Sequence, residues 1–150
     1  MQIVIGNVLS GDEVKTARAA LERARFVDGR ETAGFAARTV KHNRQAAGGD
    51  RTLETVRKLI AARVIENDLF RLAVRPKTLS PLLFSRYEPS MQYGSHADDA
   101  LMDGMRTDVA FTLFLSEPDS YVGGELVIDS MPGQGARLEI SVPQVVFRGE

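Results

Sequence analysis

The sequence predicts an α+β fold, because its helical patterns lie in the first half and most of its strand patterns in the second. Two segments, near residues 11–25 and 53–67, carry apolar residues at helical spacing. From Leu72 onward, prolines separate short runs rich in β-branched and aromatic residues, which is typical of strands joined by turns. We therefore expect one structural unit, with a helical and strand-containing support region at residues 1–75. Residues 76–150 are expected to form a sandwich or a barrel.

The first predicted elements are a short strand and a capped helix. Gln2–Leu9 is an apolar run rich in Ile and Val, which indicates a strand. Ser10 and Glu13 then match the S-x-x-E capping box, in which each side chain accepts a hydrogen bond from a free backbone N–H. We expect a helix to about Arg25, because apolar residues recur at helical spacing at Val14, Ala17, Leu21 and Ala24.

The middle of the chain predicts a loop region and a second helix. Residues 28–50 are largely polar and contain four glycines, so we expect mostly loop, with one strand around Gly34–Lys41. The helix that follows is expected to end near Asn67–Asp68, and Glu54 stands four residues before Lys58 as a supporting pair. Its apolar face is formed by Leu53, Val56, Ile60 and Val64.

The second half of the chain predicts strands separated by turns. Each run is short, apolar and bounded by residues that favour turns. The predicted strands are Leu82–Tyr87, Val109–Leu115, Glu125–Asp129 and Arg137–Val142.

The composition excludes several classes of site and partner. The 150 residues are 43% hydrophobic and 26% charged, which suits one globular domain. The net charge of −1 gives no electrostatic reason to expect nucleic acid or an acidic membrane surface as a partner. The absence of cysteine excludes disulfides, zinc–thiolate sites and a cysteine nucleophile. The first ten residues do not match a signal peptide, and no apolar run reaches membrane-spanning length, so we expect a cytoplasmic protein.

A histidine and an aspartate two residues apart are the candidate metal ligands. His96 and Asp98 follow an extended approach, Tyr93-Gly-Ser-His96, and residues i and i+2 of an extended segment point to the same face. An imidazole nitrogen and a carboxylate oxygen are then expected side by side. They would be two of the three ligands in the two-histidine, one-carboxylate triad that holds non-haem Fe(II). Taken alone, the tripeptide His96–Asp98 is more typical of a surface turn. The sequence on either side of it favours the metal site instead.

The neighbouring sequence resembles a known enzyme family in several separate blocks. Arg86–Asp98 resembles the R-Y-x(n)-Y-x-x-H-x-D stretch of prolyl-hydroxylase-like dioxygenases. Arg106–Pro118 and Tyr121–Ile128 are similar to the next two strands of those enzymes. Lys41–Gln45 and Asn67–Phe70 match the bacterial PKHD-type hydroxylases more closely still. The blocks occur in the same order and extend over nearly the whole chain.

The resemblance implies a double-stranded β-helix, or jelly roll, that carries Fe(II) and 2-oxoglutarate, with residues 76–150 as a partial jelly roll. Enzymes of this kind release succinate and carbon dioxide from 2-oxoglutarate and hydroxylate an unactivated C–H bond. L-ascorbate usually returns stray oxidised iron to Fe(II) for them. The resemblance also implies that His96 and Asp98 bind the iron, and that Tyr87 hydrogen-bonds the far carboxylate of 2-oxoglutarate. The alternative for Tyr87 is a ring packed in the core.

Other polar residues near these blocks have simpler explanations. Tyr93 is expected to support the strand before the metal site. Asp99 points away from the ligands if the segment is extended, and Gly123–Gly124 is expected to serve a turn rather than phosphate binding. Asn43–Arg44 suits either the substrate entrance or a loop beside a short strand. His42 is expected to be a polar loop histidine rather than a ligand.

The chain differs from the family near its end. Relatives carry a second histidine ligand on a late strand, followed by an arginine that binds the far carboxylate of 2-oxoglutarate, and no histidine follows His96 here. Ser141–Glu150 does not resemble the corresponding segment, and Arg148 lies too early to be that arginine. We therefore expect a jelly roll that is incomplete at its C-terminus, through an early stop or a shifted reading frame.

Two functions from different classes remain open. The first is an Fe(II)- and 2-oxoglutarate-dependent hydroxylase that acts on an unknown small-molecule or peptidyl substrate. The second is a non-catalytic remnant, or a metal- or ligand-binding module, that lacks the distal histidine and arginine. A cupin-like sugar- or metal-binding jelly roll explains the strands but not the matching blocks. The sequence indicates neither the substrate nor the oligomeric state.

Overall fold

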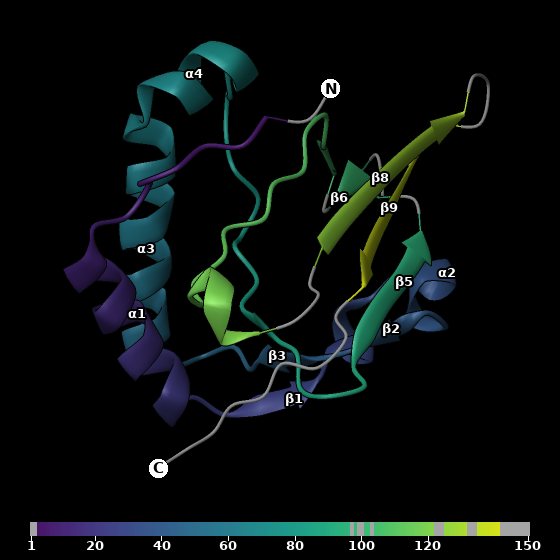
Figure 1. The fold of residues 1–150 in the computed structure, drawn as a ribbon, viewed down its shortest axis with the longest axis horizontal. Helices are drawn as coiled ribbons and strands as arrows, with labels where there is room; N and C mark the ends of the chain where they lie inside the picture. The colour runs from purple at the N-terminus through teal and green to yellow at the C-terminus, as the bar shows by residue number, and fades with distance from the viewer. Residues whose placement is uncertain are drawn as a thin grey trace. The chain divides into compact units, whose positions relative to one another are not determined.

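The computed structural model of the chain describes residues 3–96, 98, 101–102, 104–121, 125–131 and 135–141. This part consists of α-helices and small antiparallel sheets, which confirms the predicted α+β class (Figure 1). Its contacts divide the chain into two compact units, Met1–Arg25 with Ala47–Leu83 and Phe26–Ala46 with Phe84–Glu150. The predicted boundary at residue 75 stays a prediction. Every helix in the described part is too short or too polar to cross a membrane.

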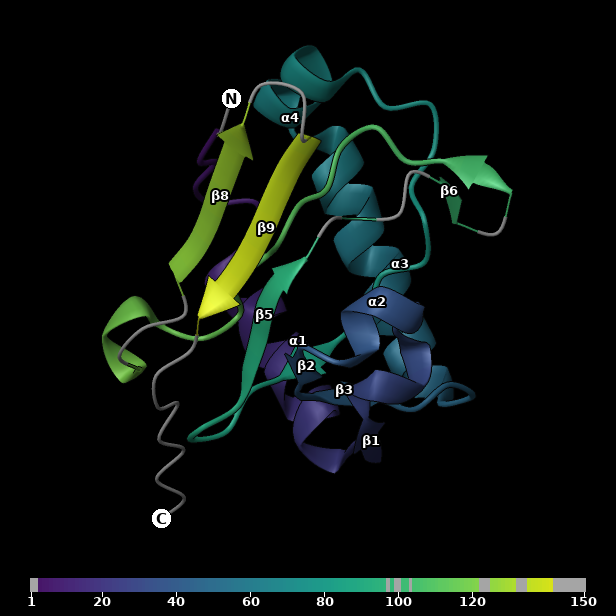
Figure 2. The same ribbon diagram turned by 90° about the vertical axis from the view of Figure 1, so that its right-hand side faces the viewer.

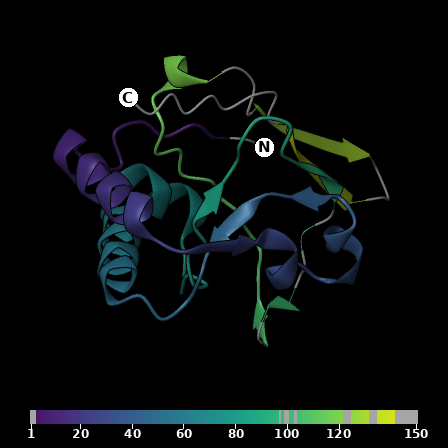
Figure 3. The same ribbon diagram turned by 90° about the horizontal axis from the view of Figure 1, so that it is seen from below.

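Helix α1 (Gly11–Arg23) begins at the predicted capping box. The Ser10 hydroxyl accepts a hydrogen bond from the Glu13 backbone N–H at 3.3 Å, and the Glu13 carboxylate accepts one from the Ser10 N–H at 2.8 Å. Both bonds satisfy N–H groups that the start of a helix leaves without partners. Ala17 is fully buried on this helix, which packs along α3 (Arg51–Glu66), as Figures 1 and 3 show.

Helix α3 confirms the second predicted helix, its end and its buried face. Asp50 caps its start by accepting hydrogen bonds from two N–H groups of the first turn. Glu54 forms its ion pair with Arg57, three residues on, and not with the predicted Lys58. The residues of the predicted apolar face are all buried, with at most 4% of their surface exposed: Leu53, Val56, Ile60 and Val64.

The structure adds a helix, α4 (Asp68–Val74), directly after α3. Asn67 ends α3 and also caps α4, by accepting a hydrogen bond from the Phe70 N–H at 2.9 Å. Arg75 ends α4 in the left-handed conformation, with a φ of 50°. Because the same asparagine ends α3 and begins α4, the sequence pattern near Asn67 indicates the end of one helix and does not reveal the start of the next.

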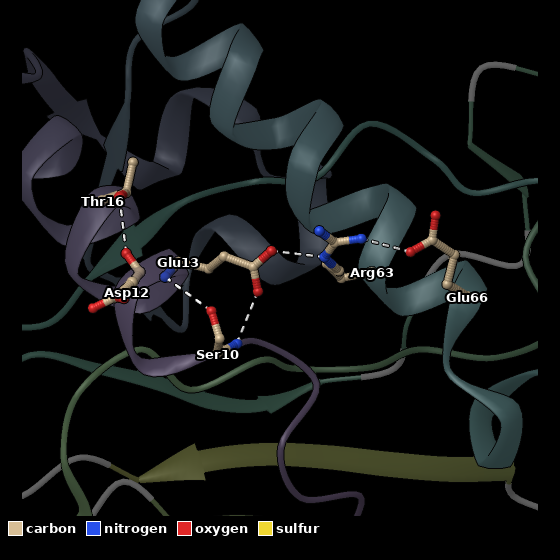
Figure 4. A network of polar contacts seen from close by, with 6 residues as sticks. All are labelled: Ser10, Asp12, Glu13, Thr16, Arg63 and Glu66. Atoms are coloured by element: carbon tan, nitrogen blue, oxygen red, sulfur yellow. Dashed lines mark hydrogen bonds and ion pairs between the residues drawn. The ribbon is translucent and has the colours of Figure 1, made fainter.

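An arginine joins α3 to the capping glutamate of α1 (Figure 4). Arg63 Nε donates to Glu13 Oε1 at 2.7 Å, and its Nη1 donates to Glu66 Oε2 at 2.7 Å. The hydrogen bond from the Ser10 backbone N–H, followed by the one from Arg63, lowers the pKa of the Glu13 carboxyl. The ionised form of Glu13 therefore stabilises both the helix cap and the contact between the two helices.

The described strands of the second unit form three antiparallel sheets. One sheet has the order β1-β3-β4, from β1 (Phe26–Asp28), β3 (Arg44–Ala46) and β4 (Ser85–Arg86). The next has the order β2-β5-β9-β8, from β2 (Lys41–His42), β5 (Gln92–His96), β9 (Gly135–Ser141) and β8 (Glu125–Met131). Figure 2 shows β5, β9 and β8 of this sheet side by side. The last sheet pairs β6 (Leu101–Met102) with β7 (Met105–Arg106).

Short helical segments complete this unit. A 3-10 turn, η1 (Gly29–Thr32), and a short helix, α2 (Phe35–Arg38), lie between β1 and β2, and a second 3-10 turn, η2 (Pro118–Ser120), precedes β8. The predicted strand around Gly34–Lys41 is therefore wrong: the chain forms α2 there, and strand begins only at Lys41.

The strand predictions in the second half are confirmed in part. The β8–β9 hairpin confirms Glu125–Asp129 and Arg137–Val142, of which Val142 lies outside the described residues. Leu82–Tyr87 is confirmed only at Ser85–Arg86, which form β4. The extended approach to His96 is confirmed by β5.

Two further predicted strands are wrong in the described residues. Ile3–Leu9, the described part of Gln2–Leu9, and Val109–Leu115 both lack strand structure. The reason is physical: a β-branched run becomes a strand only where a neighbour completes the hydrogen-bond ladder, and neither segment has a strand partner in the described part. The described sheets do not close into a barrel, and the jelly roll stays a prediction.

Candidate metal centre

Strand β5 carries His96 at an inner position of the four-stranded sheet. Its Tyr93 pairs with Lys41 of β2 on one side, and its other side pairs with β9, where His96 lies opposite Leu138. The register with β9 shifts between Tyr93 and His96, as at a β-bulge. His96 is buried, whereas Asp98 follows the strand and is exposed.

The structure brings the two predicted ligands together. His96 Nε2 lies 3.4 Å from Asp98 Oδ1. His96 Nδ1 lies 2.8 Å from the carbonyl oxygen of Gly94, which can only accept, so the hydrogen bond places a proton on Nδ1. Nε2 of the neutral ring then keeps its lone pair and faces the Asp98 carboxylate. A metal ion placed between these two acceptor atoms could accept a lone pair from each.

The chemistry of this pair fits a divalent transition metal. Imidazole nitrogen and carboxylate oxygen are typical ligands of non-haem iron. Metal–ligand distances to such atoms are about 2.1 Å, and two of them together exceed the observed separation, so one ion can contact both atoms. A histidine that binds metal through one nitrogen usually donates its other N–H to a carbonyl or carboxylate, as His96 does to Gly94.

The described residues do not supply a third ligand. No group of three or more histidine, aspartate or glutamate side chains gathers among them. His42 is exposed on β2 and is not one of the paired groups. Its charge makes only the smallest contribution to lowering the pKa of the Asp28 carboxyl to about 2, an effect that comes mainly from hydrogen bonds with Arg30. Asp99, Gly123–Gly124 and Arg148 lie outside the described residues.

An aromatic ring supports the histidine from within the same strand. The rings of Tyr93 and His96 stack with centroids 3.7 Å apart and planes 14° apart. Residues i and i+3 of a regular strand lie on opposite faces, and the register shift between these two explains why both rings share one face. Tyr93 thus packs directly on the candidate ligand, a contact that the sequence does not predict.

Three polar residues that alternate along one segment are buried. Lys41, Asn43 and Gln45 are 6%, 2% and 3% exposed, whereas His42 and Arg44 between them are exposed. This is the period of an extended chain with one face turned inward, but with polar instead of apolar residues inside. Asn43 therefore lies in the short connection between β2 and β3 with its side chain in the interior, and Lys41 and Gln45 are interior residues whose individual roles the sequence does not indicate. The K-x-N-x-Q alternation is the signal that could have found them.

The buried amide of Asn43 holds Tyr87. Its Nδ2 donates to the Tyr87 hydroxyl at 2.9 Å. Burial raises the pKa of the half-buried Tyr87 phenol, and the hydrogen bond from Asn43 opposes this in part. Because the phenol oxygen accepts from Asn43, its own O–H remains available to donate to a further acceptor. The hydroxyl of Tyr87 is thus held in one place by the Asn43 amide.

A chain of polar contacts surrounds Lys41 and Gln45. Lys41 Nζ donates to the Thr32 hydroxyl at 3.3 Å, and that hydroxyl also contacts Gln45 Oε1. Gln45 Nε2 donates to the Ser85 hydroxyl at 3.3 Å. Lys41 Nζ also lies 5.1 Å from the centroid of the Tyr93 ring. Lys41, Tyr93 and His96 therefore follow one another on one face of the sheet.

Comparison with known proteins shows which family the chain resembles in sequence. No family model matches it. It is 49% identical over 125 residues to a PKHD-type hydroxylase from Picosynechococcus sp., a match that covers 83% of this chain and 57% of the relative. The chain belongs to the PKHD-type hydroxylase family.

A member from Maricaulis maris is 47% identical over 134 residues, and one from Crocosphaera subtropica is 45% identical over 136 residues. Each of these two matches covers 89% of this chain and 61% of the relative. The chain thus spans about three fifths of the length of the curated relatives that it matches.

Proposed function

We propose that this chain carries part of the active site of an Fe(II)- and 2-oxoglutarate-dependent hydroxylase with a jelly-roll fold. The observation that carries the proposal is the His96–Asp98 pair, in which a lone pair on Nε2 faces a carboxylate oxygen at 3.4 Å. The printed names of the relatives, PKHD-type hydroxylases, support the reaction class.

The proposed roles follow from the contacts of each residue. His96 and Asp98 bind the metal, the Gly94 carbonyl keeps the imidazole proton on Nδ1, and Tyr93 holds the plane of the ring. The Tyr87 hydroxyl, whose oxygen accepts from Asn43, donates its proton to the far carboxylate of 2-oxoglutarate. When bound, Fe(II) and 2-oxoglutarate would supply the oxidising chemistry together with dioxygen, with succinate and carbon dioxide as coproducts and L-ascorbate as the reductant that maintains the ferrous state.

Metal binding by the purified chain tests the site directly. Titration with Co(II), a spectroscopic probe for Fe(II), should show binding that His96→Ala and Asp98→Ala each weaken by about tenfold or more. His42→Ala is the matched control, because that histidine is exposed and outside the pair. Equal Co(II) affinity in the wild type and the His96→Ala variant would remove the basis of the proposal.

The reaction is tested separately. Succinate release from 2-oxoglutarate, with Fe(II), oxygen and ascorbate, should exceed that of the His96→Ala variant. A second candidate function, a metal-binding module without catalysis, is favoured by the presence of only two ligands among the described residues. Co(II) binding that depends on His96, together with succinate release equal to that of the variant, would select this alternative.

A further inference from the structure

Lys41 is a buried cation whose charge is not balanced by an anion in the described part of the chain. It is 6% exposed, its one hydrogen bond there goes to the neutral hydroxyl of Thr32 at 3.3 Å, and it forms no ion pair with a described carboxylate. Burial lowers the pKa of its ammonium group. A buried charge without a counterion is unfavourable, so an anion that reached Lys41 would be stabilised there.

The position of Lys41 places that charge beside the candidate metal centre. Lys41 of β2 lies opposite Tyr93 of β5, so both side chains point to the same face of the sheet. The ammonium nitrogen is 5.1 Å from the centroid of the Tyr93 ring, and that ring stacks on His96 at 3.7 Å. The cation and the ring of the candidate ligand therefore both lie close to the ring of Tyr93.

The remaining donors of Lys41 suit an oxygen anion. An ammonium group carries three N–H donors and the described contacts use one of them, on Thr32. An ion pair between lysine and a carboxylate is strongest where water is excluded, which matches the burial of Lys41. We propose that Lys41 binds the carboxylate of a small organic acid, at a subsite that adjoins the His96–Asp98 pair.

Two sources could supply this carboxylate, the 2-oxo acid cosubstrate or the compound that is hydroxylated. This inference rests on the proposed function, because that function assigns the metal to the neighbouring His96–Asp98 pair. The binding of the acid to Lys41 itself does not require the metal. Binding measured in metal-free protein therefore separates the failure of this inference from the failure of the metal site.

The experiment is calorimetric titration of the metal-free chain with glutarate, 2-oxoglutarate and uncharged glutaramide. The variants are Lys41→Met, which removes the charge, Lys41→Arg, which keeps it, and Lys58→Met, which removes an exposed lysine of α3 as the matched control. We expect the wild type to bind at least one of the two acids and not glutaramide. Lys41→Met should weaken that binding by about tenfold or more, whereas Lys41→Arg should largely retain it and Lys58→Met should leave it unchanged.

Competition between the two acids identifies the source. If glutarate displaces 2-oxoglutarate and both depend on Lys41, the subsite belongs to the cosubstrate. If only glutarate depends on Lys41 and the two acids bind together, the subsite belongs to the hydroxylated compound. Both results support the proposal. No binding of either acid to the wild type, or equal affinity in a folded Lys41→Met variant, overturns it.

A measurement on the wild type covers the case in which Lys41→Met does not fold. In protein labelled with ¹³C-lysine, the ε-methylene signal of Lys41 can be assigned by its loss in Lys41→Arg. Glutarate should shift this signal and leave that of Lys58 in place, while glutaramide should shift neither. An unchanged Lys41 signal at saturating glutarate contradicts the proposal.

Discussion

The side-chain amide of Asn43 donates a hydrogen bond to the hydroxyl of Tyr87 at 2.9 Å, across 44 positions of sequence. The other amide atom, Oδ1, is buried without a hydrogen-bond partner among the described residues and lies against Gly29. This orientation is favoured over the flipped one, because an oxygen tolerates contact with the Cα hydrogens of glycine, whereas a buried NH₂ group there would leave two donors unsatisfied. The contact therefore fixes the hydroxyl of Tyr87 as a donor toward any ligand.

Replacing Asn43 should destabilise the protein and release Tyr87. Asn43→Ala leaves the half-buried phenol without its donor and opens space beside Gly29, so the free energy of unfolding should fall by about 1–3 kcal/mol. Urea unfolding followed by circular dichroism measures the loss. Arg44→Ala, at the exposed neighbouring position, is the control and should change the free energy by less than about 0.5 kcal/mol. In the Tyr87→Phe background the Asn43 substitution should cost less, and equal costs in both backgrounds would show that the two residues are not coupled.

Gly29 should not tolerate a side chain. A Cβ at this position would lie 1.8 Å from Asn43 Oδ1, and the Gly29 N–H donates to the Asn43 carbonyl at 2.9 Å, so the backbone cannot move away without losing that bond. We expect Gly29→Ala to lower the free energy of unfolding by about 1–3 kcal/mol. Gly48→Ala is the matched control, because a Cβ there meets nothing within 4 Å. Equal midpoints of urea unfolding for the two variants would contradict the close approach.

What the sequence predicts correctly here is local. The face of α3 depends only on a 3.6-residue period, so Leu53, Val56, Ile60 and Val64 could be assigned from their spacing. The capping box of Ser10 and Glu13 spans three residues and is confirmed for the same reason. The pairing of His96 with Asp98 is also local, because it follows from residues two positions apart in an extended approach.

What the sequence does not predict depends on distant partners. The burial of Asn43 needs Tyr87, 44 residues away, and that of Lys41 needs the ring of Tyr93 on a paired strand. Polar residues at a period of two are normally taken to face solvent, so the interior face at residues 41–45 cannot be recognised before its partners are known. The same reason explains the errors at residues 3–9 and 109–115, where an apolar pattern has no neighbouring strand in the described part.

The contact between α1 and α3 should weaken in acid through Glu13. Hydrogen bonds from the Ser10 N–H and Arg63 lower the pKa of this carboxyl below its ordinary value of 4.5 in the folded state. A group with a lowered folded pKa contributes stability that is fully present above the unfolded pKa and is lost as the pH falls through the folded pKa. The melting temperature of the wild type should therefore drop below about pH 4.5, and that of Glu13→Gln should drop less steeply over the same interval. Glu22→Gln, on the exposed surface of α1, is the control and should follow the wild type.

The stacked ring of Tyr93 should be needed for metal affinity although it supplies no ligand atom to the pair. Its ring lies 3.7 Å from that of His96 with nearly parallel planes, and it is therefore the contact that keeps Nε2 directed at Asp98. Tyr93→Leu removes the stack, and we expect Co(II) affinity to fall by about tenfold, as is common when a group that orients a ligand is lost. Tyr93→Phe keeps the ring and should bind within about twofold of the wild type, which separates the stack from the contacts of the hydroxyl. If Tyr93→Leu folds and binds Co(II) as tightly as the wild type, the orientation of His96 must come from the Nδ1–H bond to Gly94 alone.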